Sequence, residues 1–297
     1  MGIDVNGARF ILDALRNGVE LDRCASLGRQ EMHLDTRQLR RVFQRFSVSM
    51  DESEAQGILA NNGDCGYSES FLARCGARQI TSFDHSPYEG AAVIHDFNTP
   101  VSIEFEDKFS CVIDSGTLEH VFDFPTAIRN CMRMVEPGGH FLSITPCNNF
   151  MGHGFYQFSP ELFYGVLSEK NGFTVERMFI FESRPNARWY RVASPGKIGG
   201  RVELTNSAMT YLLVQARRTG QAVPADITPQ QSDYIPMWDG ELSPPPPNGR
   251  SEEPRLFRRY KGYLKGFLRA KARNALRLLP VESLRTPFRS PWYEPYE

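Results

Sequence analysis

The stretch FSCVIDSGTLEHVFDFPTAIRNCMRMVEPGGHFLSITP, residues 109–146, decides the fold of this chain. It begins with an apolar run, 109–113, that a carboxylate ends, as is typical of a buried strand. Residues 125–135 then place their apolar side chains at helical spacing, and Pro137-Gly138-Gly139 predicts a tight turn. A second strand is expected at 140–144. This order of strand, helix and strand predicts a parallel α/β sheet.

The same alternation continues on both sides of this stretch. Before it, we expect helices at 6–17, 37–47 and 68–75 and strands at 23–27, 79–83 and 91–94. After it, we expect a helix with Ser159 as N-cap and Pro160 in its first turn, followed by strands at 173–181 and 209–216. Together these elements predict one large domain with helices on both faces of the sheet.

Composition narrows the functional classes. Lys and Arg total 34 against 35 for Asp and Glu, so the whole chain has no electrostatic preference for nucleic acid or membrane. The six cysteines form no C-x-x-C pair, which favours reduced thiols. The N-terminus lacks the pattern of a secretory signal, and no apolar run approaches the roughly 20 residues that span a bilayer. We therefore expect a cytoplasmic location.

The last part of the chain differs in composition. Residues 220–254 are rich in Pro, Gln and Ser and predict a linker or arm. Residues 255–297 predict a basic amphipathic tail, in which 255–289 carry many cations and the single acid Glu282. This segment would contact an anionic membrane surface, the enzyme's own acidic flank or a partner protein. No recognised RNA-binding module accompanies the charge, so we do not expect nucleic acid as a partner.

Ligands of parallel α/β sheets bind at the carboxyl ends of the strands, so the first polar residues there are candidates. They are Gly28, Asp84, Asp96 and Asp114. A carboxylate after the second strand suits the two hydroxyls of a ribose, and a second acid beside Phe97 suits an adenine. Turn formation or helix capping is the alternative role for each acid.

The stretch 109–146, with LEHV at 118–121 and PGG at 137–139, resembles the second half of class I S-adenosylmethionine-dependent methyltransferases. The resemblance extends through FDHSPYEGAAVIHDFN and HGFYQFSPELF and covers about residues 23–217. It implies a Rossmann-like methyltransferase fold with a seven-stranded, mostly parallel sheet and a helical basic C-terminal extension. The methyltransferase domain would occupy residues 1–219, with an insertion at 30–66, and its cosubstrate would be S-adenosylmethionine.

By this resemblance, the cosubstrate would contact Gly28, Arg29, Gln30, Asp84, His85, Asp96, Phe97, Asp114, Ser115 and Gly116. One departure stands out, because the glycine-rich D-x-G-x-G loop of the family is absent after the first strand. Only Gly28 keeps its place there. Arg29 or Gln30 would then contact the cosubstrate carboxylate, and Gly63–Tyr67 would complete the loop from further along the chain.

A second departure concerns metal binding. Some relatives carry an E-x-x-E-H metal motif where this chain has Gly116-Thr117-Leu118-Glu119-His120, without the first acid. Because the ligand set is incomplete, we expect no metal. His120 is instead expected to line the pocket, as a further candidate catalytic residue.

The loop at 145–158 is the candidate acceptor-binding segment, because it combines polar groups, aromatic residues and glycines. We predict His153 as the general base that takes the proton of an acceptor hydroxyl. The predicted acceptor-binding residues are Asn148, Asn149, His153, Tyr156 and Gln157. The alternative is an ordinary connection packed on the sheet.

The predicted reaction is methylation of an oxygen on a small molecule, glycan or lipid-linked precursor. Two alternatives remain open at this point: a nitrogen or carbon target, and a non-catalytic binding or scaffold protein on the same fold. The sequence does not indicate an oligomeric state.

Overall fold

The computed structural model describes residues 2–60, 66–198, 201–220, 228–232, 234 and 293–296. Most of the predicted linker and the basic segment 255–289 lie outside these residues, so the membrane contact and the domain boundaries stay predictions. Within the described part, no helix is both long and apolar enough to cross a membrane.

Five of the seven α-helices of the described residues agree with the expected ones. They are α1 (Val5–Arg16), α2 (Thr36–Arg45), α3 (Glu52–Ala60), α4 (Glu69–Arg74), α5 (Phe124–Met134), α6 (Pro160–Val166) and α7 (Pro195–Ile198). Short 3-10 helices are η1 (Ile103–Phe105), η2 (Leu118–His120) and η3 (Glu169–Asn171). Ser159 precedes α6 as predicted, although its side chain makes no capping hydrogen bond. The helices α3 and α7 were not predicted from the sequence.

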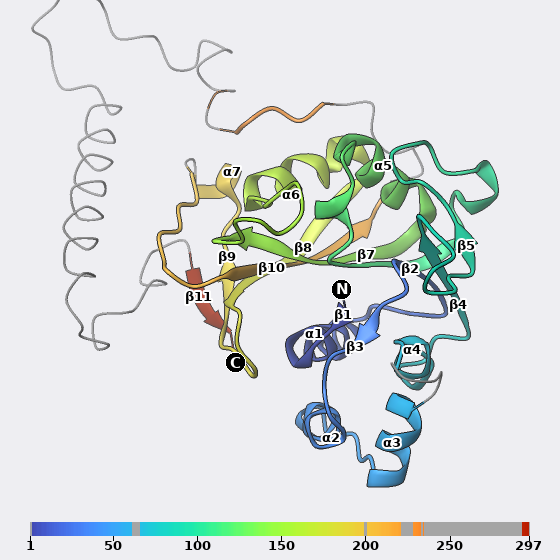
Figure 1. The fold of residues 1–297 in the computed structure, drawn as a ribbon. Helices are drawn as coiled ribbons and strands as arrows, with labels where there is room; N and C mark the ends of the chain where they lie inside the picture. The colour runs from blue at the N-terminus through green and yellow to red at the C-terminus, as the bar shows by residue number, and fades with distance from the viewer. Residues whose placement is uncertain are drawn as a thin grey trace, which may run out of the picture.

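The main sheet has the strand order β11-β9-β8-β10-β7-β6-β2-β4-β5 (Figure 1). Its strands are β2 (Arg23–Leu27), β4 (Gln79–Asp84), β5 (Val93–Ile94), β6 (Phe109–Ser115), β7 (Val135–Asn148), β8 (Phe173–Glu182), β9 (Trp189–Val192), β10 (Thr210–Arg218) and β11 (Tyr293–Tyr296). The pairs among β5, β4, β2, β6 and β7 are parallel, and the remaining pairs are antiparallel. The fold class expected from the sequence is therefore confirmed.

Two details of the sheet correct the sequence-based expectation. The sheet of the described residues has nine strands, because β9 and β11 extend the seven predicted ones at the antiparallel edge. The strand β11 also returns the last described residues to the sheet. In addition, β7 begins at Val135 rather than at His140, so Pro137-Gly138-Gly139 lies within its bounds. Residues 136–139 separate the pairs Phe109–Val135 and Cys111–His140, and the φ of +87° at Gly138 fits the predicted turn.

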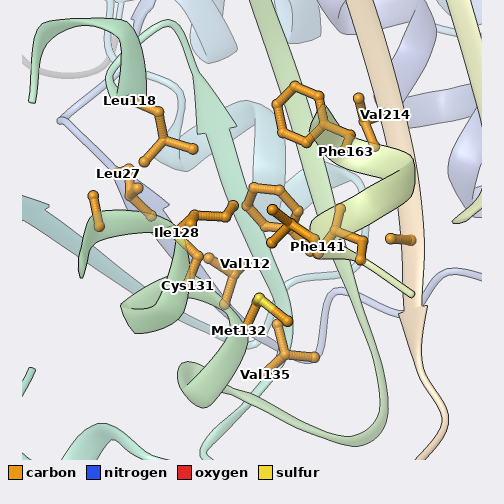
Figure 2. Packing of buried hydrophobic residues seen from close by; sticks show 14 of the residues in the cluster. Leu27, Val112, Leu118, Ile128, Cys131, Met132, Val135, Phe141, Phe163 and Val214 are labelled. Carbon is orange, nitrogen blue, oxygen red and sulfur yellow. The ribbon is translucent and has the colours of Figure 1, made fainter. Parts of the chain in front are cut away.

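Each face of the sheet carries its own apolar cluster (Figures 1 and 2). On one face, α5 and α6 pack on the strands, and Figure 2 shows Leu27, Val112, Leu118, Ile128, Cys131, Met132, Val135, Phe141, Phe163 and Val214. On the other face, α1 to α4 provide the second cluster. Because both faces are covered, the strand ends remain as the place where polar groups gather.

A small second sheet lies near these ends. Its parallel strands are β1 (Gly2–Ile3) and β3 (Glu31–Met32). The hydroxyl of Ser115, at the end of β6, donates to the carbonyl of Gly2 at 3.3 Å. The start of the described chain is thus fixed beside the carboxyl end of the main sheet.

Candidate functional site

A cavity of about 500 Å³ opens at the carboxyl ends of β2, β4 and β5, and we call it the strand-end cavity. It is lined by Gly28, Arg29, Gln30, Phe83, Asp84, His85, Ser86, Tyr88, Glu89, His95, Asp96, Phe97, Asn98, Thr117, His120 and Val121. The structure thus brings together the predicted cosubstrate residues from Gly28 to Phe97. Their individual contacts with a ligand stay predictions.

Gly28 forms the turn that follows β2. Its N–H donates to the carbonyl of Phe83 at 2.7 Å, and its carbonyl accepts from the hydroxyl of Ser26 at 2.8 Å. Its φ of +72° is in the left-handed region, and an added Cβ would lie 2.9 Å from atoms of both Gln30 and Thr117. The left-handed backbone therefore favours glycine here, and the absence of a Cβ lets a ligand approach the backbone closely.

Arg29 and Gln30 have partners within the protein. Arg29 donates to the Glu69 carboxylate at 2.7 Å and to the Glu89 carbonyl at 2.8 Å, and its guanidinium lies 4.0 Å from the centre of the Tyr67 ring. Gln30 is buried and donates to the Leu27 carbonyl. Among the described residues its Oε1 has no hydrogen-bond partner. Of the predicted loop Gly63–Tyr67, only Gly66 and Tyr67 are described.

Asp84 and Asp96 both stabilise a turn and line the strand-end cavity. Oδ1 of Asp84, the last residue of β4, accepts from the Ser86 N–H at 3.1 Å. Oδ1 of Asp96 accepts from the backbone and side chain of Asn98 at 2.9 and 2.7 Å, and these bonds hold the pKa of Asp96 below its usual value. Nδ1 of His85 lies 3.7 Å from the same Asp96 oxygen. Turn formation and ligand binding are therefore compatible for both acids.

Asp114, Ser115 and Gly116 are not among the residues that line the strand-end cavity, and their contact with the cosubstrate stays a prediction. Asp114 is fully buried. Its Oδ1 accepts from the N–H groups of Thr117 and Leu118 at 2.9 and 3.2 Å, and its Oδ2 accepts from the Ser143 hydroxyl at 2.7 Å. Burial raises the pKa of this carboxyl. Asp114 thus supports the turn that leads to η2.

A second group of polar side chains, the Glu119 cluster, consists of Glu119, His120 and His153. One atom from each, a carboxylate oxygen or an imidazole nitrogen, lies within 4.8 Å of the other two. The Nε2 of His153 lies 3.6 Å from Oε1 of Glu119, and the ring centres of His120 and His153 are 5.0 Å apart. His120 also lines the strand-end cavity, so the two sites share a wall.

Glu119 is the unusual member of this cluster because it is fully buried. Its Oε2 accepts from the Thr145 hydroxyl at 3.4 Å, whereas its Oε1 has no hydrogen-bond partner among the described residues. Burial raises the pKa of Glu119, and the negative charge of Asp114 raises it further. Burial and the neighbouring His153 lower the pKa of His120. A buried carboxylate next to two imidazoles indicates a site for a cation or a proton.

The loop that carries His153 is fastened to Glu119. The carbonyl of Glu119 accepts from the N–H groups of Phe155 and Tyr156 at 2.7 and 3.2 Å. A Cβ at Gly154, whose φ is +68°, would lie 2.7 Å from that carbonyl, so this close approach needs glycine. The position of His153 relative to Glu119 is therefore fixed by the backbone.

Other predicted acceptor residues hold the same loop. The Asn148 amide donates to Asn206 at 2.9 Å, and the Asn149 amide donates to Asn206 and to Ala208. Oε1 of Gln157 accepts a hydrogen bond from the Phe150 N–H at 2.8 Å. The hydroxyl of Tyr156 donates to the Phe122 carbonyl at 2.6 Å. The structure thus gives these four a local role, and their contact with an acceptor stays a prediction.

Three exposed apolar residues lie within two positions of His120 or His153 in the sequence. They were not predicted as site residues. Phe122, Met151 and Phe155 are 71%, 94% and 65% exposed. The rings of Phe122 and Phe155 meet edge to face with centres 5.7 Å apart. The sequence signal for them was an apolar residue two positions away from each of the two histidines. We refer to the three as the apolar rim.

Comparison with known families gives the class of the protein. Residues 63–143 match the family described as a methyltransferase domain. This segment contains Asp84, Asp96 and Asp114 together with two members of the Glu119 cluster. No curated protein matches the chain.

Among solved structures, the chain is similar to an S-adenosylmethionine-dependent methyltransferase from Mesorhizobium loti, with 17% identity, coverage of 72% of this chain and 100% of that one, and a TM-score of 0.40. It is also similar to 1,6-didemethyltoxoflavin-N1-methyltransferase from Burkholderia thailandensis, with 15% identity, coverage of 73% and 78%, and a TM-score of 0.39. The N-methyltransferase NodS from Bradyrhizobium japonicum shows 12% identity, coverage of 72% and 96%, and a TM-score of 0.39. At these scores the similarities do not bear on the acceptor.

The α/β sheet places acids after neighbouring strands at one cavity, which is where α/β folds bind nucleoside ligands. Together with the match over residues 63–143, this arrangement confirms the resemblance found in the sequence. Residues 63–143 carry a methyltransferase domain, so the protein is an S-adenosylmethionine-dependent methyltransferase, with S-adenosylmethionine as its cosubstrate.

Proposed function

We propose that this methyltransferase methylates an oxygen of its acceptor, which binds beside the Glu119 cluster. The observation that supports this proposal is the position of His120, which belongs both to the strand-end cavity and to the Glu119 cluster. A cosubstrate held by Asp84 and Asp96 would therefore lie next to the buried carboxylate and the second histidine.

The chemistry explains why such a cluster favours an oxygen target. The cosubstrate supplies an electrophilic methyl group on a sulfonium, and the protein mainly aligns the acceptor with it. A hydroxyl must lose its proton to become a good nucleophile, whereas a neutral amine already has an available electron pair. Burial raises the pKa of the Glu119 carboxyl to about 8, and the carboxyl lies beside His153, so it is suited to accept the proton that a hydroxyl loses.

The apolar rim narrows the acceptor class. Phe122 and Phe155 form an exposed aromatic pair beside the loop that carries His153. Exposed apolar groups next to a site are typical of surfaces that bind an apolar ligand or partner. Among a small molecule, a glycan and a lipid-linked precursor, we therefore favour acceptors in which the reactive hydroxyl stands beside an apolar moiety.

A labelled-methyl assay tests this proposal. The full chain would be incubated with methyl-labelled S-adenosylmethionine and paired acceptors that differ only in a hydroxyl or an amine, on aromatic, sugar and lipid-linked frameworks. We expect label in the hydroxyl members, with the methyl position assigned by nuclear magnetic resonance. Label confined to the amine members, or on carbon, would contradict the proposal.

The binding or scaffold alternative has a separate outcome. Its basis is the altered loop after β2, in which only Gly28 of the family's glycines is present. Calorimetric titration with S-adenosylmethionine and S-adenosylhomocysteine measures cosubstrate binding without an acceptor. Saturable binding without any transfer across the whole acceptor panel would favour the non-catalytic alternative.

A further inference from the structure

The Glu119 cluster has the composition of a metal site. It offers one carboxylate oxygen and two imidazole nitrogens, all within 4.8 Å of one another. One carboxylate with two histidines is a ligand set that zinc, iron, manganese and cobalt ions accept, whereas magnesium and calcium prefer oxygen ligands. The sequence analysis had considered only Glu119 and His120, so the third ligand, His153, becomes visible in the fold.

The geometry around Glu119 also points to a cation. Its Oε1 is buried, has no hydrogen-bond partner among the described residues, and faces Nε2 of His153 at 3.6 Å. That separation is too long for a hydrogen bond, which spans about 2.7–3.2 Å. It suits two ligands of one ion, because bonds of about 2.0–2.2 Å place neighbouring ligand atoms roughly 3–3.5 Å apart.

The backbone holds the ligands together before any ion binds. Glu119 and His120 lie on η2, and the Glu119 carbonyl accepts from Phe155 and Tyr156 of the loop that carries His153. A site with such prior order needs little rearrangement to take an ion. His153 and His120 are partly exposed, which leaves an approach from solvent.

We propose that Glu119, His120 and His153 bind one divalent transition-metal ion with an open position for the acceptor oxygen. This inference rests on the proposed function for the identity of the acceptor, but not for the binding of the ion. It replaces the sequence-based expectation of a metal-free site. It also changes the role predicted for His153 from proton acceptor to metal ligand.

The reaction balances with the ion as a Lewis acid. The acceptor hydroxyl coordinates the ion, which lowers its pKa, and its proton passes to solvent. An electron pair of the oxygen then forms the bond to the methyl carbon, while the carbon–sulfur bond breaks and its electrons remain on sulfur. The products are the methyl ether and S-adenosylhomocysteine, and neither the ion nor the protein is oxidised or reduced.

Metal binding can be measured on the full chain without cosubstrate or acceptor. The protein would be treated with a chelator, dialysed and titrated with Co²⁺, followed by visible absorption, and with Zn²⁺, followed by calorimetry. We expect one ion per chain, and an affinity that falls about tenfold or more in His153→Ala and in Glu119→Gln. His33→Ala is the matched control, because His33 lies outside the cluster with its side chain 52% exposed, and it should bind as the unmodified chain does.

Two results would overturn the inference: no saturable binding at millimolar Co²⁺ or Zn²⁺, or equal affinity in the unmodified chain and the cluster variants. If Glu119→Gln fails to fold, as judged by circular dichroism, the metal affinities of His153→Ala and His120→Ala test the inference instead. Both variants change residues that are not buried.

The outcome is separable from that of the proposed function. Ion binding together with methylation of nitrogen would support the metal site and refute the oxygen target. Methylation of a hydroxyl at the same rate before and after chelation would support the oxygen target and refute the catalytic ion.

Discussion

The strand-end cavity and the Glu119 cluster share His120, yet the chain builds them in different ways. The cavity collects residues that directly follow β2, β4 and β5, so their position depends on the parallel sheet. The cluster joins a buried carboxylate on η2 to a histidine on a later loop, and its geometry depends on hydrogen bonds between these segments. The cosubstrate side therefore follows from the fold, whereas the acceptor side depends on contacts between η2 and a later loop.

Replacement of His153 should give the largest effect and should separate the two regions. We expect His153→Ala to lower kcat by about 10²- to 10⁴-fold, because the acceptor oxygen loses the group that activates it. Affinity for S-adenosylmethionine should stay unchanged, since His153 does not line the strand-end cavity. Turnover with labelled cosubstrate and calorimetry measure the two quantities. Equal loss of turnover in the control His33→Ala would contradict this division.

The same division explains what the sequence could predict. Apolar runs that end at Leu27, Phe83 and Ile113 marked the strands, and the parallel arrangement placed the polar residues after the first two at one cavity. Burial of Asp114 could not be seen, because a carboxylate that supports a turn and one that binds a ligand look alike in sequence. The strands β9 and β11 were missed because they are short and belong to segments without strand periodicity.

The approach of His153 to Glu119 was missed for a related reason. It depends on a carbonyl at Glu119 that accepts from the later loop, and no periodic pattern encodes such a contact. The glycine at 154, which this approach requires, was the only local signal. Glycine before an aromatic residue is common in ordinary loops, so this signal did not distinguish a site from a connection.

Asp114 supports both regions, so its removal should destabilise the whole domain. In Asp114→Ala, the N–H groups of Thr117 and Leu118 and the hydroxyl of Ser143 lose their acceptor in a buried place. We expect the free energy of unfolding to fall by about 2–4 kcal/mol. Urea denaturation measures this change. Asp114→Asn keeps one acceptor oxygen and should lose less, and equal stability of the alanine variant would show that the turn does not depend on Asp114.

Asp84 should affect the strand-end cavity alone. Its carboxylate is predicted to accept from the two ribose hydroxyls, and hydrogen bonds to a charged group contribute about 1.5–3 kcal/mol each. We expect Asp84→Ala to weaken S-adenosylmethionine binding by about 3 kcal/mol, or roughly 150-fold. Calorimetry measures the affinity, and Co²⁺ binding at the Glu119 cluster should remain as in the unmodified chain. Unchanged cosubstrate affinity would leave Asp84 with only its bond to Ser86.

The smallest expected effect concerns the apolar rim, and it tests whether the acceptor contacts that surface. Phe155 is 65% exposed and pairs edge to face with Phe122, so Phe155→Ser should leave the folded state nearly as stable as before. If an apolar part of the acceptor packs on this ring, KM for the acceptor should rise about fivefold, equivalent to about 1 kcal/mol, with kcat little changed. Ile103→Ser is the matched control, because Ile103 is 82% exposed and lies outside both regions. A rise in KM of the same size in both variants, or in neither, would place the apolar part of the acceptor elsewhere on the protein.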